Sequence, residues 1–440
     1  MNMLQGPLTK KILLFTLPIA LSSMLQQLFN AADISIVGYF GSADALAAVG
    51  TNGEIIALIV TLSSGLAIGV NVLIASRIGQ KKLGEISQIV HTAIALAEII
   101  GILGLLTGQC IATTLLRLIQ TPDTILFSAE SYLRIYLIGY PFLLLYDFGA
   151  AILRAHGNSS YPFIALVIAG IANVVLNLFF VVVLHLGVAG VAIATDISTV
   201  LSAVLVLYRL PKEIPDLHLS WRKLHIHSQY MMQILKTGIP SAIQGAVFCF
   251  ANIFVQASVN SFGAVAIAGN TIAMNLEYFA YYIITAFGQT ATTFTSQNYA
   301  ANQRKRCRQI LWLCVLFSTI FSAMITVPIV IFRSHFSGLF STEPSVIESA
   351  GIRIMCILLF EPVCSLYEIP AGVLRGTDRS LLPAIITVIG TCAFRIIWIC
   401  TVFRQYHSLP VLYAAFPISW LITIVLIAAS FIVVKPLQEL

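Results

Sequence analysis

The sequence predicts an all-α polytopic membrane protein with about twelve transmembrane helices in two pseudo-symmetric six-helix lobes. Three observations support this fold class. Of the 440 residues, 58% are hydrophobic and only 10% are charged, whereas about 25% of the residues in a soluble domain are charged. Apolar runs of about 20 residues, the length that crosses a bilayer, recur along the whole chain. The pattern of the first half also returns in the second half.

The apolar runs are separated by charged residues or by glycine and proline. Each run predicts one membrane-spanning helix. The predicted helices cover residues 12–39, 47–75, 87–111, 131–154, 161–184, 188–208, 231–262, 265–297, 309–332, 350–374, 381–403 and 411–434. The polar segment 209–230 contains two prolines and predicts a cytoplasmic loop between an N-lobe, residues 1–208, and a C-lobe, residues 231–440.

An internal repeat relates the two lobes. Pro18 precedes Gly41 by the same number of residues as Pro240 precedes Gly263. Two lobes of six helices with the same orientation indicate a parallel repeat about an axis along the membrane normal. Such repeats are typical of transporters that work by alternating access, with the substrate bound between the lobes.

The repeat also duplicates a pair of charges. Asp147 precedes Arg154 by seven residues, and Glu368 precedes Arg375 by seven residues, with an offset of 221 between the two pairs. Seven residues are about two helical turns, so each acid can lie on the same helix face as its arginine. We interpret these four residues as structural or gating charges.

The lysines and arginines predict the orientation. With both termini in the cytoplasm, most basic residues fall in the inner loops, and only a few fall outside. The outer ones are Arg117, Arg134, Arg333, Arg353 and Arg404. This bias follows the positive-inside rule and predicts a multi-pass protein of the cytoplasmic (inner) membrane. The net charge of +6 therefore reflects topology and does not predict nucleic-acid binding.

Asp33 is an ionisable residue inside the first predicted helix. A charged side chain inside a membrane-spanning helix costs about 2.5–3.5 kcal/mol on insertion scales, so Asp33 is a functional candidate by default. Arg395 lies inside the eleventh helix, where we expect it to pair with Glu361 or another buried acid because an unpaired charge is costly.

Several segments together resemble multidrug and toxic compound extrusion (MATE) transporters over essentially the full length of the chain. They are FNAADISIVGYFG in the first helix, SRIGQ in the following loop, LRAHGNSSYP with its copy LRGTDRSLLP, GVAGVAIAT, IAGNTIAMNLEYF and TSQNYAA. The order, spacing and duplication of the segments carry the resemblance. It implies a V-shaped, twelve-helix antiporter that expels drugs or metabolites, often organic cations, in exchange for sodium or protons.

A candidate site for the coupling cation comprises Asp33, Asn173, Asn177 and Thr195. Helix geometry places all four at one depth in the outer half of the N-lobe. A carboxylate, two amides and a hydroxyl supply oxygen ligands for sodium, or a network that binds a proton. The resemblance assigns the same positions to the N-lobe cation site, although some relatives have an aspartate in place of Asn177, which leaves Na⁺ or H⁺ open.

Three further acids in the N-lobe are open cases. Asp196 follows Thr195 and points about 100° away from it, so it either completes the site or faces the helix end. For Glu54 and Glu98, a hydrogen bond to a neighbouring helix is an alternative to a role in coupling.

The substrate-binding candidates lie mainly in the C-lobe. Glu277 is predicted near the membrane midplane, next to aromatic residues that suit an organic cation through charge pairing and cation–π contact. Structural pairing of Glu277 is the alternative. The other candidates are Asn252, Gln256, Tyr278, Tyr281 and, from the first helix, Gln26.

No P-loop or nucleophile-elbow motif occurs in the sequence, so we expect neither an ATP-driven pump nor an enzyme. We expect a monomer in the bilayer that transports small organic substrates, has no cofactor or metal apart from Na⁺ or H⁺ as the coupling ion, and contributes to antibiotic resistance through multidrug efflux. The alternatives are a lipid-linked oligosaccharide flippase of the same wider superfamily and a non-transporting membrane receptor. The small number of predicted cavity cations disfavours a flippase, and the duplicated helices disfavour a receptor.

Overall fold

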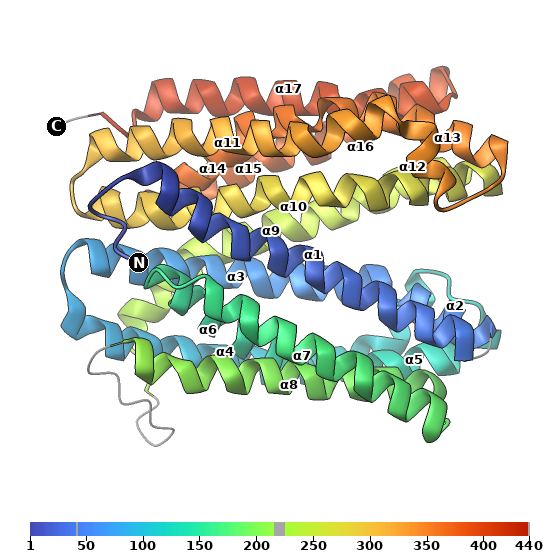
Figure 1. Ribbon diagram of the computed structural model, residues 1–440, viewed down its shortest axis with the longest axis horizontal. Coiled ribbons are helices and arrows are strands. Elements are labelled where there is room, and N and C mark those ends of the chain that lie inside the picture. The colour runs from blue at the N-terminus through green and yellow to red at the C-terminus, as the bar shows by residue number, and fades with distance from the viewer. Residues whose placement is uncertain (41–42, 215–224, 439–440) are drawn as a thin grey trace. The chain divides into compact units, whose positions relative to one another are not determined.

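The computed structural model describes residues 1–40, 43–214 and 225–438, and these residues form helices and no β-strand (Figure 1). The first half contains α1 (Leu8–Phe40), α2 (Ala43–Thr51), α3 (Gly53–Gly79), the 3₁₀ turn η1 (Leu83–Glu85), α4 (Ile86–Leu118), α5 (Asp123–Ile138), α6 (Tyr140–Ala155), α7 (Ser160–Leu178), the π-helical segment η2 (Phe179–Val183) and α8 (Gly187–Glu213).

The second half repeats this arrangement with more irregular segments. It contains α9 (Ser228–Asn260), α10 (Ala264–Ala300), α11 (Arg304–Ile331), α12 (Arg333–Gly338), α13 (Pro344–Cys356), the 3₁₀ segment η4 (Leu358–Cys364), α14 (Ser365–Gly376), α15 (Leu381–Thr387), the π-helical segment η5 (Val388–Ala393), α16 (Phe394–Trp398), the π-helical segment η6 (Ile399–Phe403) and α17 (Leu409–Val434).

The all-helical, multi-pass fold class is confirmed. In the part of the chain that the structure describes, ten helices are long and apolar enough to cross a membrane, and α5 and α6, bent by 45° relative to each other, can form an eleventh span. The predicted span 265–297 forms α10, which has 37 residues. This helix is not among the ten because its sequence is rich in Asn, Gln, Ser and Thr.

The helices form two compact units. Unit 1 comprises residues 1–2 and 21–242, and unit 2 comprises residues 3–20 and 243–440. The division falls within α1 and α9. The cytoplasmic loop expected over 209–230, between an N-lobe and a C-lobe, stays a prediction. Much of that segment, residues 215–224, lies outside the described residues.

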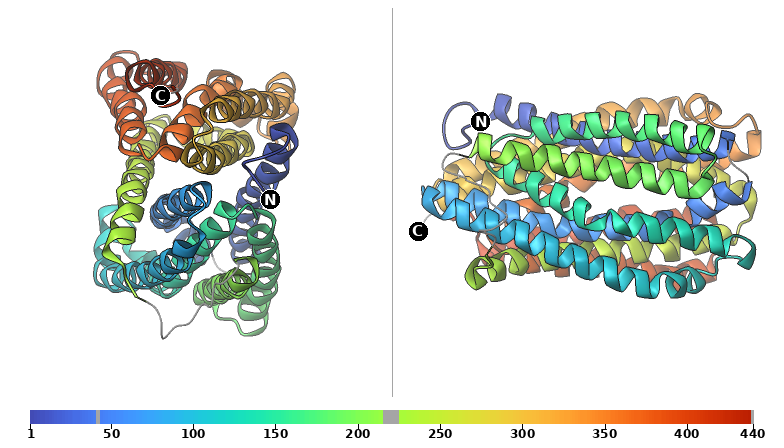
Figure 2. Two further views of the ribbon diagram at one scale, coloured as in Figure 1. Left: turned by 90° about the vertical axis from the view of Figure 1, so that its left-hand side faces the viewer. Right: turned by 90° about the horizontal axis from the view of Figure 1, so that it is seen from below.

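Packing explains why the first part of α1 belongs to unit 2. The ring of Phe15 packs edge-on against that of Phe294, with 5.3 Å between the ring centroids. Next to Phe15, the hydroxyl of Thr16 lies 2.8 Å from that of Thr290. Phe15 and Phe294 join a buried apolar cluster that includes α1, α10 and α11. In unit 1, α7 and α8 lie side by side (Figure 1, Figure 2).

The internal repeat extends to the irregular parts of the helices. Helix α7 begins at Ser160 and α15 at Leu381, an offset of 221 residues. With the same offset, the π-helical segment η2 corresponds within one residue to η6, and the bend at Gly139 between α5 and α6 falls on η4. Because these deviations from regular helix recur in both halves, the two halves share a common helix plan.

Candidate functional site

The four residues predicted to bind the coupling cation lie together in unit 1. Asn177 Nδ2 on α7 donates to Asp33 Oδ1 on α1 at 2.5 Å and to Asn173 Oδ1 at 3.2 Å. Asn173 Nδ2 donates to Thr195 Oγ1 on α8 at 3.4 Å, and Thr195 Oγ1 lies 3.4 Å from Asp33 Oδ2. These contacts close a ring of polar side chains, which we call the Asp33 ring.

The Asp33 ring is buried and has no cationic partner. Asp33 is 6% exposed and Asn177 is fully buried. Among the described residues, no Lys, Arg or His forms an ion pair with Asp33. The Oδ1 atom of Asn177 is buried and accepts no hydrogen bond. Because buried polar atoms are normally satisfied, this oxygen and the carboxylate are available to a further polar ligand.

A close approach of two helices positions the ring. Asn173 and Asn177 are four residues apart on α7 and therefore share one face. Gly170 lies one turn earlier on that face, and a Cβ atom there would be only 1.6 Å from the Phe29 ring. Phe29 in turn precedes Asp33 by one turn of α1. The absence of a side chain at Gly170 thus allows α1 to pack against α7 and brings Asp33 to Asn177.

The ring is not duplicated in unit 2. The residues of the second half that correspond in the repeat to the four ring residues are all apolar or aromatic: Val255, Phe394, Trp398 and Phe416. The two halves share a helix plan, but only unit 1 has this set of polar side chains.

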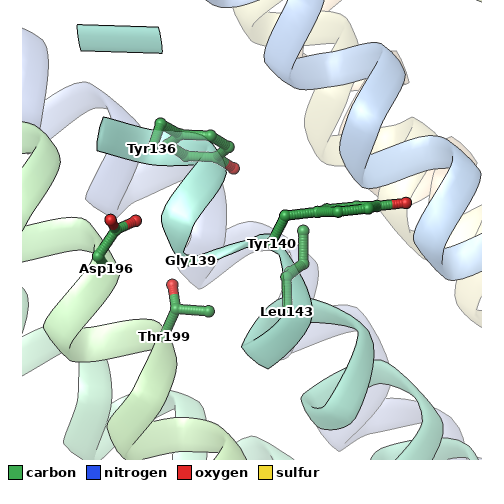
Figure 3. Close-up of a pocket in the computed structure, with 6 residues that line it drawn as sticks. All are labelled: Tyr136, Gly139, Tyr140, Leu143, Asp196 and Thr199. Carbon is green, nitrogen blue, oxygen red and sulfur yellow. The ribbon is translucent and has the colours of Figure 1, made fainter. Parts of the chain in front are cut away.

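Asp196 faces away from the Asp33 ring. Its carboxylate lies close to the backbone of Gly139, where an added Cβ would be 2.3 Å from Oδ1. Figure 3 shows Asp196 and Thr199 on one side of a cavity of about 10 Å³ whose other residues come from the bend between α5 and α6. A cavity of that size holds about one water molecule.

Two tyrosines that the sequence analysis did not single out lie near both acids. Tyr132 is 4% exposed and interacts with the charges of Asp33 and Asp196. Tyr136 stacks on Tyr132, with 6.3 Å between the ring centroids, and lines the Asp196 cavity. The four-residue spacing of the two tyrosines was the only signal in the sequence that they share a helix face.

In unit 2, Glu277 already has a cationic partner. Arg353 Nη2 on α13 lies 2.8 Å from Glu277 Oε2 on α10, and Arg353 Nη1 donates to Asn270 Oδ1 at 2.7 Å. Asn270 Nδ2 donates to Gln256 Oε1 at 3.0 Å. The sequence analysis placed Arg353 on the outer side of the membrane, but its side chain is buried. Direct contact of Glu277 with a cationic substrate stays a prediction, and it requires Arg353 to move away.

Comparison with known proteins identifies the family. A model of the MatE family matches residues 18–179 and again residues 240–400. The two matches cover well over half of the chain. The chain belongs to the MatE family. Because the same model matches each half once, the comparison also supports the internal duplication.

Relatives of this MatE protein are named as multidrug resistance proteins or as transporters. It is 24% identical over 423 residues to a probable multidrug resistance protein, YoeA, of Bacillus subtilis, covering 94% of this chain and 91% of the relative. It is 24% identical over 370 residues to the FAD transporter of Shewanella oneidensis, covering 81% and 79%. A solved multidrug resistance MATE family transporter of the MOP superfamily, in an outward-facing conformation, has a TM-score of 0.91 and 20% identity, covering 100% and 98%.

The remaining candidate acids of the MatE protein do not join the Asp33 ring. Glu54 is exposed on the first turn of α3, and Glu98 is half-buried on α4. Asp147 accepts a hydrogen bond from Ser63 at 2.6 Å. Its counterpart Glu368 forms an ion pair with Arg375, whose Nη1 lies 3.0 Å from Oε1.

The pairing expected between Arg395 and Glu361 or another buried acid is wrong. Arg395 Nε donates to Ser419 Oγ at 3.2 Å, and its guanidinium lies 3.9 Å from the centroid of the Phe416 ring. Among the described ion pairs, none joins Arg395 to Glu361 or to another acid. Aromatic contact and a hydroxyl therefore accommodate this buried charge. Glu361 is also buried, and its Oε2 accepts no hydrogen bond.

The other predicted substrate residues are spread over both units. Asn252 is half-buried on α9. The rings of Tyr278 and Tyr282 stack on α10 with 5.8 Å between their centroids, and Tyr281 is 40% exposed. Gln26 is exposed and belongs to unit 1. Arg154, the remaining predicted gating residue, is half-buried at the end of α6.

Proposed function

We propose that this protein is an antiporter that exports small organic compounds in exchange for one monovalent cation, Na⁺ or H⁺, bound at the Asp33 ring. The proposal rests on the buried carboxylate of Asp33, which has no cationic partner among the described residues and contacts two neutral side chains of its ring, Asn177 and Thr195. Membership of a transporter family and the two-fold internal repeat support a transport function.

Electrostatics gives the reason for ion binding. A carboxylate in a membrane interior is costly unless its charge is compensated. A proton removes the charge, and Na⁺ neutralises it while Asp33, Asn177 and Thr195 supply oxygen ligands. The ring contains a single carboxylate, so one monovalent cation balances its charge.

The bound cation would couple to substrate through alternating access, the mechanism typical of proteins with such repeats. Cation binding at the ring favours the state that releases substrate to the outside. Because coupling is reciprocal, bound substrate weakens cation binding by the same factor. The membrane potential adds about 2.3 kcal/mol per elementary charge and 100 mV to the driving force.

The proposed substrate class is broad because the acid expected to attract an organic cation, Glu277, is not free of a cationic partner. Glu277, the acid that would attract an organic cation, is paired with Arg353 in unit 2. The relatives include proteins named for multidrug resistance and one named for FAD. We propose small organic compounds, among them organic cations that displace Arg353 from Glu277. We also propose a monomer in the cytoplasmic membrane with both termini in the cytoplasm.

The test is efflux from proteoliposomes loaded with a fluorescent organic cation, in which Na⁺ and H⁺ gradients are imposed separately. We expect one of the two inward gradients to drive efflux and thereby to identify the coupling ion. The proposal fails if neither gradient changes efflux across several organic cations and FAD. In that case, flipping of a lipid-linked sugar is the next activity to assay.

A further inference from the structure

A basic groove with a volume of about 840 Å³ lies in unit 2, which does not contain the Asp33 ring. The residues just before and at the start of α1 form one wall, and the first turns of α11 form the other. The lining residues are Gly6, Pro7, Leu8, Thr9, Lys305, Arg306, Arg308, Gln309, Trp312 and Leu313. Three of these residues are basic and none is acidic, so the groove has a positive potential.

The exposed face of α11 changes from basic to apolar along the helix. Lys305 and Arg308 are exposed in its first two turns. One turn further on the same face, Trp312 is 63% exposed, followed by Leu316 at 52% and Ile320 at 44%. Tryptophan is enriched where a membrane protein crosses from headgroups to acyl chains. The pattern therefore places this boundary of the bilayer next to Trp312, with the basic residues at headgroup level.

Backbone groups add to the positive potential. Helix α1 begins at Leu8 and α11 at Arg304, so the starts of both helices border the groove. The first four N–H groups of a helix have no partner within the helix, and the helix dipole favours an anion near them. Phosphate binding at helix N-termini follows from these two properties.

Hydrogen bonds hold the walls in place. Arg306 Nη2 donates to the carbonyl oxygens of Met3 and Gln5, both at 3.2 Å. Arg308 Nη2 donates to the carbonyl oxygen of Leu437 at 3.5 Å. The segment before α1 is thus tied to α11, and the groove is formed before a ligand arrives.

We propose that this groove binds the headgroup phosphate of an anionic phospholipid, with the acyl chains lying along Trp312 and the apolar face of α11. A lipid fits better than a soluble phosphate because the basic lining continues directly into an exposed apolar face. The site is separate from the proposed transport activity and does not depend on it.

The test uses Trp312 as a reporter in lipid nanodiscs of phosphatidylcholine. Brominated phosphatidylglycerol or brominated phosphatidylcholine is titrated in, and the fluorescence of a Trp312→Phe variant is subtracted to remove the other tryptophans. We expect brominated phosphatidylglycerol to quench Trp312 at a mole fraction about thirtyfold lower than brominated phosphatidylcholine does, the effect of two basic residues near the lipid. The double variant Lys305→Gln/Arg308→Gln should lose most of this preference.

The matched control is Lys81→Gln/Lys82→Gln, which removes two exposed basic residues from a loop of unit 1. It should leave the quenching unchanged. Equal quenching by the two brominated lipids overturns the proposal, and so does a preference that survives in the Lys305/Arg308 variant. Competition by millimolar glycerol phosphate would show a soluble phosphate site and would also overturn the assignment to a lipid.

Discussion

At the scale of single residues, Thr195 and Asp196 are neighbours in sequence with different surroundings. Thr195 belongs to the Asp33 ring, whereas Asp196 lines the cavity near Gly139. We expect Thr195→Val to weaken the apparent affinity for the coupling ion by about three- to tenfold, the effect of one lost hydrogen-bonding group. Asp196→Asn should leave that affinity within about twofold. Ion titrations of substrate efflux measure the affinity of both variants. A larger loss of affinity in Asp196→Asn than in Thr195→Val would place the coupling site at Asp196.

The ion pair between Glu277 and Arg353 should stabilise the folded protein. Removal of one partner from a buried ion pair leaves an uncompensated charge and typically costs about 3–5 kcal/mol. We expect Glu277→Gln and Arg353→Met each to lower the thermal unfolding temperature of the purified protein clearly. The double variant should be more stable than the sum of the single effects predicts. Simple additivity would show that the two charges do not stabilise each other.

At the scale of helices, the contact of α1 with α7 depends on Gly170. A methyl group there collides with the Phe29 ring, and overpacking of this kind typically costs about 1–3 kcal/mol. We expect Gly170→Ala to reduce both thermal stability and ion-dependent efflux because it moves Asp33 away from Asn177.

The same substitution at an uncrowded glycine is the control for this prediction. A Cβ atom at Gly53 in α3 would have no neighbouring atom within 4 Å, so Gly53→Ala should behave as wild type. Adding Phe29→Ala to Gly170→Ala should restore part of the ion dependence because the collision is gone. If Gly170→Ala is itself silent, the close packing of these helices does not position the ring.

The helices were largely predictable from the sequence, but their irregularities were not. Each predicted apolar run corresponds to a helical segment. Hydropathy depends only on local composition, so the runs are visible in the sequence, and a chain that crosses a membrane satisfies its backbone hydrogen bonds as a helix. The bend at Gly139 lies just before Pro141, a local signal for a break in a helix that the sequence analysis did not use. We found no sequence pattern that marks the π-helical segment η2. Polar residues in α10 kept it below the hydropathy expected of a span, although its length was predicted well.

At the scale of the whole molecule, helix geometry predicted where the ring residues lie but not how the C-lobe charges pair. Asp33, Asn173, Asn177 and Thr195 share one depth, so counting residues along three helices was sufficient to group them. Glu277 and Arg353 are 76 residues apart, and their contact depends on how α10 and α13 pack. The sequence identified the carboxylate of Glu277 but did not show which arginine pairs with it.

The two halves of the molecule differ in their buried polar side chains. A common helix plan supports two similar units, yet among the described residues only unit 1 has the Asp33 ring, and unit 2 has Val255 at the position that corresponds to Asp33. We therefore expect ion coupling to depend on one half of the molecule. The central claim is that Asp33 is the group that binds the coupling ion.

The most direct measurement is efflux from proteoliposomes, driven by the coupling gradient, for wild type, Asp33→Asn and the control Asp123→Asn. Asp123 is an exposed carboxylate on the first turn of α5, so its loss removes the same charge without touching the ring. We predict that Asp33→Asn folds, binds substrate and loses the gradient dependence, whereas Asp123→Asn behaves as wild type. Gradient-driven efflux that persists in folded Asp33→Asn would contradict the account.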